Sequence, residues 1–194
     1  MDNSYNIVKC TPLTEGHIQL AEVTYTHQMY SGETSPERTS EVYHISNAVA
    51  VLPYDPNTRK VLLIEQFRIG AALNQEGRQI EIIAGSIDEG ESPEFAARRE
   101  AKEEANIDVG ELIHLTTFYP CSGLSDQIMD VYGVAMDLSE AGGVHGKQDE
   151  GEDIRVMVVS VDEAIELIAQ GKIKASAAII ALYQLKLGME DGKD

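Results

Sequence analysis

The spacing of apolar and polar residues predicts short strands along most of the 194-residue chain. In the first 45 residues, apolar and polar positions alternate, as in strands with one buried face, and the turn-rich residues 31–33 interrupt the alternation. Residues 48–53 are continuously apolar, which is typical of a buried strand. Further strands are expected at residues 61–67, 79–84, 112–119, 130–136 and 154–159. We therefore predict a small antiparallel β unit, residues 1–45, ahead of a main α/β domain, residues 46–194.

Three segments are predicted to be helices. Residues 162–170, capped by Ser160 or Asp162, and residues 176–187 follow the last strand. The remaining helix begins near Pro93 and ends near residue 106. Loops are expected at residues 70–79, 120–125 and 142–153.

The helix beginning near residue 93 has clear signals at both ends. Ser92 suits the N-cap position, and Pro93 suits the first helical position. Residues 95–105 contain no Gly, Pro or β-branched residue, so helix propensity favours three turns. Asn106 then tolerates the left-handed conformation that often ends a helix.

Three carboxylates share one side of this helix. Glu100, Glu103 and Glu104 are spaced at i, i+3 and i+4. Beside them runs a stripe of small residues that would let the helix pack closely on a sheet: Ala97, Ala101 and Ala105. Like charges this close repel, so a divalent cation bound between them would relieve the repulsion. Mg²⁺ is suitable because it commonly binds one or two carboxylates together with substrate phosphates. The alternative is a glutamate-rich helix face that is simply solvated.

Charge and composition narrow the range of partners. The chain has 15 basic and 33 acidic residues, a net charge of −18, so neither nucleic acid nor an anionic membrane is an expected partner. There is no signal-peptide pattern and no apolar run long enough to span a membrane. Cys10 and Cys121 lack any CxxC or zinc-type spacing, and we expect two free thiols in a reducing compartment, the cytoplasm.

The segment GSIDEGESPEFAARREAKEEANI, residues 85–107, resembles the Nudix box. The matching residues are Gly85, Glu91, Arg99, Glu100, Glu103, Glu104 and Ile107. Ala101 is a weak match to an aliphatic position, and Asn106 replaces the second glycine of the pattern. The resemblance implies the Nudix fold, an α/β/α sandwich with a mixed sheet.

The resemblance also implies which residues bind metal. Glu100 and Glu104 would be the principal ligands, and Glu103 would be a further ligand or would hold the catalytic water. The backbone carbonyl of Ala84, just before the box, would complete the site. The expected cofactor is Mg²⁺, with Mn²⁺ as an alternative.

Other residues of the box would be structural by the same resemblance. Glu91 would pair with Arg99 and fix the loop against the helix, and Gly85 would allow a close approach of the chain.

Segments outside the box resemble the ADP-ribose pyrophosphatase branch of the family. The similarity runs from about residue 48 to residue 187 and is carried by VLPYDP, VLLIEQFRIG, IEIIAGSIDEGES, HGKQDEGEDIRV and GKIKASAAIIAL. It implies hydrolysis of ADP-ribose to AMP and ribose 5-phosphate. It also implies a homodimer that exchanges its N-terminal strands.

In the resembled enzymes, the general base is a glutamate on the loop before the last core strand. Here that loop carries Glu150 and Glu152. We favour Glu150 because a residue farther from the strand has more freedom to close over substrate, and a general base contributes roughly 10²–10⁴-fold to the rate.

Candidate substrate-binding residues lie before and after the box. Arg68 follows a strand and is a candidate for contacting phosphate or base, and Glu81 lies in the strand that leads into the box. Ser122, Gly123 and Ser125 offer hydroxyl and N–H groups. Their local sequence, Pro-Cys-Ser-Gly, departs from the Pro-Gly-Gly of the resembled branch, which bears on substrate preference.

Three other functions compete with ADP-ribose hydrolysis. The first is a pyrophosphatase for another nucleoside-diphosphate sugar, such as GDP-mannose or ADP-glucose. The second is a sensor that binds ADP-ribose without hydrolysing it, although such a protein has no need of three clustered carboxylates. The third is an interaction protein that uses its acidic surface.

Overall fold

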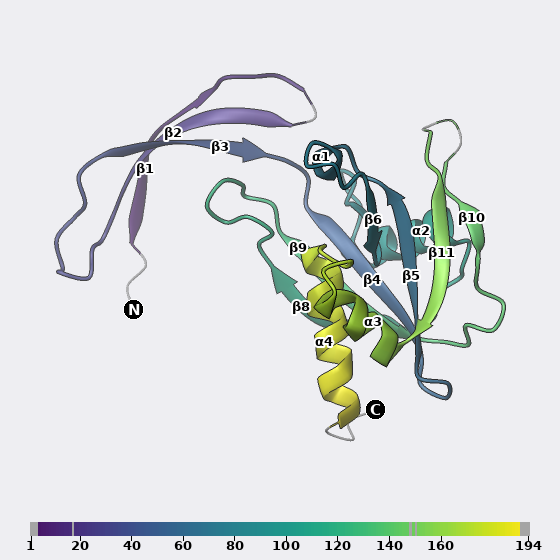
Figure 1. The fold of residues 1–194 in the computed structure, drawn as a ribbon. Coiled ribbons are helices and arrows are strands. Elements are labelled where there is room, and N and C mark those ends of the chain that lie inside the picture. Colours follow the sequence, from purple (N-terminus) through teal and green to yellow (C-terminus); the bar gives the residue numbers. More distant parts are fainter. Residues whose placement is uncertain (1–3, 17, 148, 150, 191–194) are drawn as a thin grey trace. The chain divides into compact units, whose positions relative to one another are not determined.

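The computed structural model describes residues 4–16, 18–147, 149 and 151–190. The chain forms two compact units, one made of residues 1–47 and 119–128 and the other of residues 48–118 and 129–194. The first unit contains strands β1 (Tyr5–Pro12), β2 (Gln19–His27) and β3 (Arg38–His44). The elements of the main unit are β4 (Ala48–Asp55), β5 (Lys60–Phe67), α1 (Ile69–Ala72), β6 (Arg78–Glu81), β7 (Ile83–Ser86), α2 (Pro93–Ala105), β8 (Ile113–Phe118), β9 (Met129–Ala135), β10 (Gly143–His145), β11 (Ile154–Ser160), α3 (Val161–Ala169) and α4 (Ser176–Glu190) (Figure 1).

The first unit is an antiparallel sheet with β2 between β1 and β3. The loop 119–128 also belongs to it, because the Tyr43 N–H donates to the Leu124 carbonyl at 2.9 Å. Likewise, the side chain of Gln127 donates to the Ser46 carbonyl at 2.8 Å. The loop that carries Ser122, Gly123 and Ser125 is therefore part of the N-terminal unit, a grouping that hydrophobic patterning does not reveal.

The main sheet is mixed. Its order is β10-β11-β5-β4-β9-β8, with β6 added on β5 and β7 added on β4. Strands β4 and β9 run parallel, whereas the other described pairs are antiparallel. This sheet and the helices that cover it confirm the predicted Nudix fold with a small antiparallel sheet at the N-terminus.

Three local predictions were wrong. Residues 79–84 are not one strand, because β6 pairs with β5 whereas β7 pairs with β4. The loop predicted at 142–153 contains β10, which is completed by pairing with β11. The loop predicted at 70–79 begins with the one-turn helix α1. Strand pairing depends on residues distant in the chain, so local alternation does not determine it.

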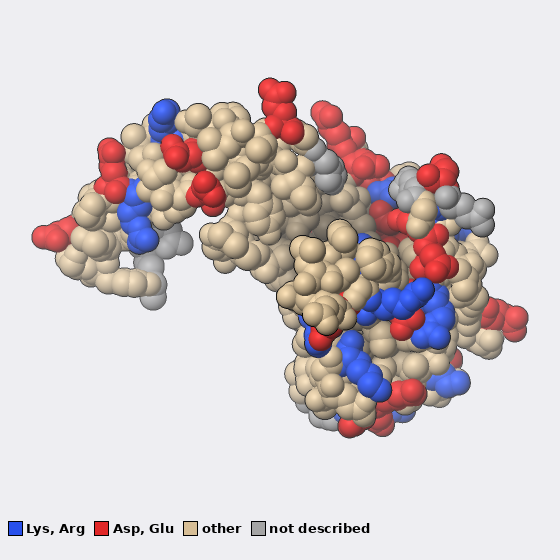
Figure 2. All heavy atoms as spheres, turned by 45° about the horizontal axis from the view of Figure 1, so that its top comes forward, with Lys and Arg blue, Asp and Glu red and all other residues tan. Residues whose placement is uncertain are grey.

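Charged side chains cover the surface unevenly. On the face shown in Figure 2, acidic side chains are spread widely and are interspersed with a smaller number of Lys and Arg side chains.

Among the residues that the structure describes, no helix is long and apolar enough to cross a membrane.

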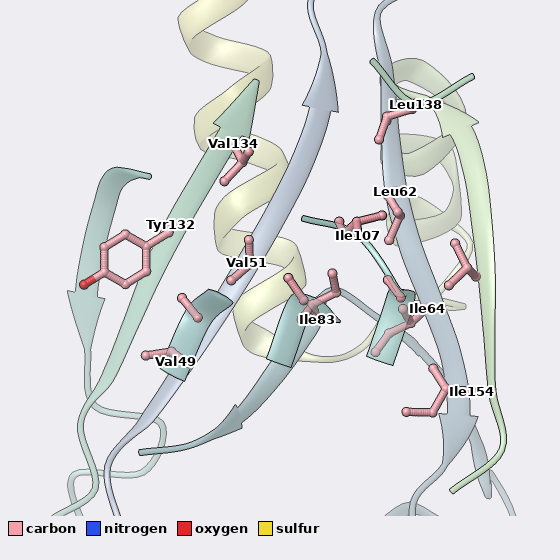
Figure 3. Packing of buried hydrophobic residues seen from close by; sticks show 14 of the residues in the cluster. Val49, Val51, Leu62, Ile64, Ile83, Ile107, Tyr132, Val134, Leu138 and Ile154 are labelled. Carbon is pink, nitrogen blue, oxygen red and sulfur yellow. The ribbon is translucent and has the colours of Figure 1, made fainter. Parts of the chain in front are cut away.

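Two apolar clusters lie on opposite faces of the main sheet. Along β4, Val49 and Val51 belong to the cluster that packs against α2, whereas Ala50 and Leu52 belong to the cluster beneath α3 and α4. Figure 3 shows the first cluster, in which side chains from β4, β5 and β9 meet Ile83 and residues after α2. The main unit is thus a three-layer α/β/α arrangement, with α2 on one face of the sheet and α3 and α4 on the other.

Helix α2 begins and ends as its sequence predicts. The Ser92 hydroxyl accepts a hydrogen bond from the Phe95 N–H at 3.2 Å, and Asn106 adopts a left-handed conformation with φ of 52°. The small-residue side of the helix is buried against the sheet: Ala96, Ala97, Ala101 and Ala105. This close packing places Glu100 and Glu104 beside β7.

Candidate active site

Glu91 and Arg99 form the structural corner of the box. Arg99 donates from Nε to Glu91 Oε1 and from Nη2 to Glu91 Oε2, each at 2.9 Å, and Nη2 also donates to the Ser86 carbonyl at 2.9 Å. The Arg99 guanidinium and the N–H of Asp88 lower the pKa of Glu91 to about 2. The Glu91 carboxylate in turn raises the pKa of Arg99. This two-pronged pair ties the loop after β7 to α2.

Gly85 and Glu100 explain why the box begins with glycine. A Cβ added at Gly85 would lie 1.9 Å from Glu100 Oε1, which is an impossible contact. Only glycine therefore lets the Glu100 carboxylate lie against the backbone of β7. Arg99 Nη1 donates to Glu100 Oε1 at 2.5 Å, and burial raises the pKa of Glu100.

Glu104 is the most deeply buried carboxylate of the three, with 4% of the residue exposed. Its Oε2 accepts from the Ala84 N–H at 2.9 Å, and its Oε1 accepts from Gln66 Nε2 at 3.2 Å. Burial raises the pKa of Glu104 to about 8, and the negative charge of Glu100 adds to the rise. A cation would compensate this buried charge better than two neutral donors do.

Glu103 lies at the edge of a cavity of about 580 Å³. Its Oε2 is 3.0 Å from Lys147 Nζ and 3.3 Å from Arg99 Nη1, and its carbonyl accepts from the Gly146 N–H at 3.2 Å. Glu152 lines the same cavity, and its Oε2 accepts from the Lys147 N–H at 2.9 Å. The loop after β10 is thereby attached to α2 next to the carboxylates.

Arg68, which directly follows β5, pairs with Glu81, the last residue of β6. The Arg68 Nε and Nη2 atoms lie 3.0 and 2.9 Å from Glu81 Oε2. Both residues line a cavity of about 200 Å³ together with Ala84 and Ser176, the first residue of α4. The structure thus brings Arg68 and Glu81 close to the backbone that contacts Glu104.

The remaining predicted site residues are placed differently. Ser122, Gly123 and Ser125 lie in the N-terminal unit, where the Ser125 hydroxyl accepts from the Gln127 N–H at 3.1 Å. Glu150 lies outside the described residues. The roles of these residues stay predictions.

Two residues close to the carboxylates were missed by the sequence reasoning. Gln66 contacts Glu104, and Lys147 contacts Glu103. A polar residue within the apolar run of β5 was a usable signal for Gln66, because a buried amide requires hydrogen-bond partners. Lys147 carried no such signal, since one lysine in a polar loop is ordinary.

The donor set fits a hard divalent cation. Glu100, Glu103 and Glu104 offer carboxylate oxygens on one side of α2, and the first and last of them are buried enough to raise their pKa values. Among the described residues, no three His, Cys, Asp or Glu side chains form a ready-made metal cage. Mg²⁺ does not need one, because it keeps several waters and uses substrate phosphates as further ligands.

Comparison with known proteins identifies the family. Residues 44–180 match the NUDIX domain. An ADP-ribose pyrophosphatase of Haemophilus influenzae is 36% identical over 179 residues, which cover 90% of this chain and 82% of that protein. An ADP-ribose pyrophosphatase of Escherichia coli strain K12 is 37% identical over 186 residues, or 95% and 89% of the two chains. A GDP-mannose pyrophosphatase of Salmonella paratyphi B is 29% identical over 188 residues, or 96% and 97%. Because the matched domain covers more than half of the sequence and contains the carboxylates of α2, this chain belongs to the Nudix family.

Proposed function

We propose that this protein hydrolyses the diphosphate bond of ADP-ribose to give AMP and ribose 5-phosphate, with Mg²⁺ as cofactor. The observation that supports this most directly is that one residue, Gln66, joins two kinds of group. The buried carboxylate of Glu104 and the Arg68–Glu81 pair are both contacted by Gln66. Cation-binding oxygens therefore lie next to a guanidinium able to bind phosphate, as diphosphate hydrolysis requires.

Each carboxylate of α2 has a distinct task in this proposal. Glu100 and Glu104 hold the cation, and Glu103, which is more exposed, holds a further cation or the attacking water. The bound metal supplies Lewis-acid polarisation of the diphosphate and a more acidic water. Arg68 orients the substrate, and Glu81 holds the Arg68 guanidinium in place.

The proton acceptor in this proposal is Glu150 or Glu152. The carboxylate of Glu152 accepts from the Lys147 N–H within its own loop, which commits one of its oxygens. We retain Glu150 as the first choice. Glu150→Gln and Glu152→Gln variants, compared at saturating ADP-ribose, identify the base as the one whose loss lowers kcat by roughly 10²–10⁴-fold with little change in KM.

The choice of ADP-ribose rests on the relatives. Proteins named ADP-ribose pyrophosphatase are 36% and 37% identical to this chain, whereas a GDP-mannose pyrophosphatase is 29% identical. The latter similarity makes another nucleoside-diphosphate sugar the second candidate. A panel of ADP-ribose, GDP-mannose and ADP-glucose, each with Mg²⁺, ranks them by kcat/KM, and a preference for GDP-mannose would overturn our choice.

The primary test follows AMP formation. Purified protein is incubated with ADP-ribose and Mg²⁺, with and without EDTA, and AMP is measured by chromatography. We expect AMP only when metal is present. Mn²⁺ replaces Mg²⁺ in a parallel reaction. Stabilisation by ADP-ribose without product would instead indicate the sensor function, with a gain of about 2.7 kcal/mol at a hundredfold excess over Kd.

We also propose that the protein is a homodimer that exchanges its N-terminal strands. The supporting observation is that Tyr5, Ile7 and Val8 on β1 are exposed apolar residues, a costly arrangement unless another surface covers them. Light scattering coupled to size exclusion measures the mass directly. A Tyr5→Glu/Ile7→Glu variant is expected to shift the mass toward the monomer, and a wild-type protein of monomer mass would contradict the proposal.

A further inference from the structure

Gln66 is a buried amide in an otherwise apolar strand. It is the second-last residue of β5, and 6% of the residue is exposed. Leu62, Leu63 and Ile64, which precede it in the strand, are fully buried. Burying an amide without partners costs free energy, so its hydrogen bonds show why it is tolerated. Gln79 lies directly opposite on β6, and the hydrogen bonds of its side chain to described residues go to the backbone carbonyls of Glu76 and Arg78.

The partners of Gln66 are two carboxylates from different elements. Nε2 donates to Glu104 Oε1 on α2 at 3.2 Å and to Glu81 Oε2 on β6 at 3.4 Å. An amide NH₂ group has two hydrogens, so these two bonds use its whole donor capacity. Gln66 therefore joins the helix that carries the carboxylates to the strand that carries the partner of Arg68.

The neutral charge of Gln66 matters to the site. Glu104 has two short donor contacts, the Ala84 N–H and Gln66 Nε2. A lysine at position 66 would neutralise Glu104 and compete with a cation, whereas an apolar residue would leave one carboxylate oxygen without a donor. An amide orients the carboxylate and leaves its negative charge available to a metal ion.

We propose that Gln66 is a positioning residue that orients Glu104 for cation binding and, through Glu81, holds Arg68 in register with it. The first half of this inference concerns metal binding alone. The second half rests on the proposed function, because it concerns the substrate. Loss of Gln66 should weaken cation binding even without substrate, and it should also raise KM by loosening the Arg68–Glu81 pair.

The test titrates Mn²⁺ into the full-length protein by calorimetry, with no substrate present. In Gln66→Met, the side chain keeps its length but loses both donors, and we expect the Kd for Mn²⁺ to rise by about 10–100-fold, as for other residues that orient metal ligands. The matched control is Gln79→Met, which removes the facing amide on β6 and should leave the Kd within about twofold of the wild type. Circular dichroism and thermal unfolding establish that each variant is folded.

Kinetics distinguish positioning from a general loss of structure. Below its melting temperature, a folded Gln66→Met protein should show a lower kcat at limiting metal and a higher KM for ADP-ribose, whereas a merely structural residue would leave both unchanged. If Gln66→Met does not fold, Gln66→Asn keeps a buried amide but withdraws the donor by one methylene, and the same rise in the Kd for Mn²⁺ is expected.

Two results separate this inference from the proposed function. A folded Gln66 variant that binds Mn²⁺ as tightly as the wild type would overturn the inference, even if ADP-ribose is hydrolysed. If the Gln66 variant binds Mn²⁺ more weakly but the wild-type protein does not hydrolyse ADP-ribose, the role of Gln66 in cation binding is supported and the proposed substrate is rejected.

Discussion

Glu91 and Glu104 belong to the same motif but have opposite environments. Glu91 is paired in two places with Arg99, and its pKa is lowered to about 2. Glu104 lies in the interior with Gln66 and the Ala84 N–H as donors, and its pKa is raised to about 8. One carboxylate is satisfied within the protein, and the other is held at a cost that a ligand can relieve.

In the proposed function, this contrast separates a structural glutamate, Glu91, from a metal-binding one, Glu104. The Glu91 carboxylate is bound in two places by a guanidinium, whereas the buried Glu104 carboxylate is bonded to neutral donors, so Glu104 gains more from a cation. Both residues are glutamates of the same motif, so the difference arises from their neighbours. Arg99 of α2 lies beside Glu91, whereas Gln66 of β5 and the Ala84 N–H of β7 lie beside Glu104.

The largest expected effect is the loss of activity in Glu104→Gln. The substitution keeps the shape of the side chain but removes its charge, so turnover of ADP-ribose should fall by at least about 10²-fold, since a metal ion supplies several kcal/mol of transition-state stabilisation. Steady-state kinetics with Mg²⁺ measures this. Turnover near the wild-type value would show that Glu104 is not needed for metal-dependent chemistry.

Glu91→Gln should instead act mainly on stability. It removes two charge-assisted hydrogen bonds and leaves the half-buried Arg99 with a poorer partner, so we expect the free energy of unfolding to fall. Urea denaturation gives this value, and the loss of turnover should be smaller than in Glu104→Gln. Equal losses of turnover in the two variants would show that Glu91 matters to catalysis as much as Glu104 does.

The pH dependence of stability should have opposite signs for the two residues. Because the pKa of folded Glu104 is raised to about 8, metal-free wild-type protein should lose stability relative to Glu104→Gln as pH rises from about 5 to about 8. Because the pKa of Glu91 is lowered to about 2, its stabilisation relative to Glu91→Gln should be complete above about pH 5 and disappear as pH falls toward 2. Unfolding measured with EDTA across this range tests both slopes, and slopes of equal sign would contradict the comparison.

The smallest effect is expected at Lys147, whose ion pair with Glu103 is only partly buried. The side chains of Lys147 and Glu103 are 38% and 24% exposed, so Lys147→Ala should lower the free energy of unfolding by no more than about 1 kcal/mol. Raising the NaCl concentration to about 1 M should reduce the difference in the free energy of unfolding between the wild type and Lys147→Ala, because salt screens exposed pairs. A loss that persists in high salt would show that Lys147 contributes through packing.

Local features of the sequence predicted much of the fold correctly. The ends of α2 depend on Ser92 and Asn106 acting on their own backbone neighbourhood, and both adopt the predicted geometry. For α3, the sequence left Ser160 and Asp162 open as caps, and the structure shows the Ser160 hydroxyl accepting from the Glu163 N–H at 3.1 Å. Such interactions span three or four residues, so they can be recognised in the sequence.

Non-local pairing was the point at which sequence reasoning failed. The division of residues 79–84 between β6 and β7 depends on which strand lies beside each half. The strand β10 forms only because β11 lies beside it. Neither neighbour is encoded in the alternation of the segment itself.

The sequence by itself determined the family, the helix that carries Glu100, Glu103 and Glu104, and the pairing of Glu91 with Arg99, because spacing along a helix and a specific motif are local properties. Only the tertiary structure decided that Glu104 is the buried carboxylate and that Gln66 joins it to the Arg68–Glu81 pair. The physical reason is that burial and hydrogen bonding to Glu104 come from strands β5 and β7, which are distant from α2 in the chain and adjacent to it only after folding.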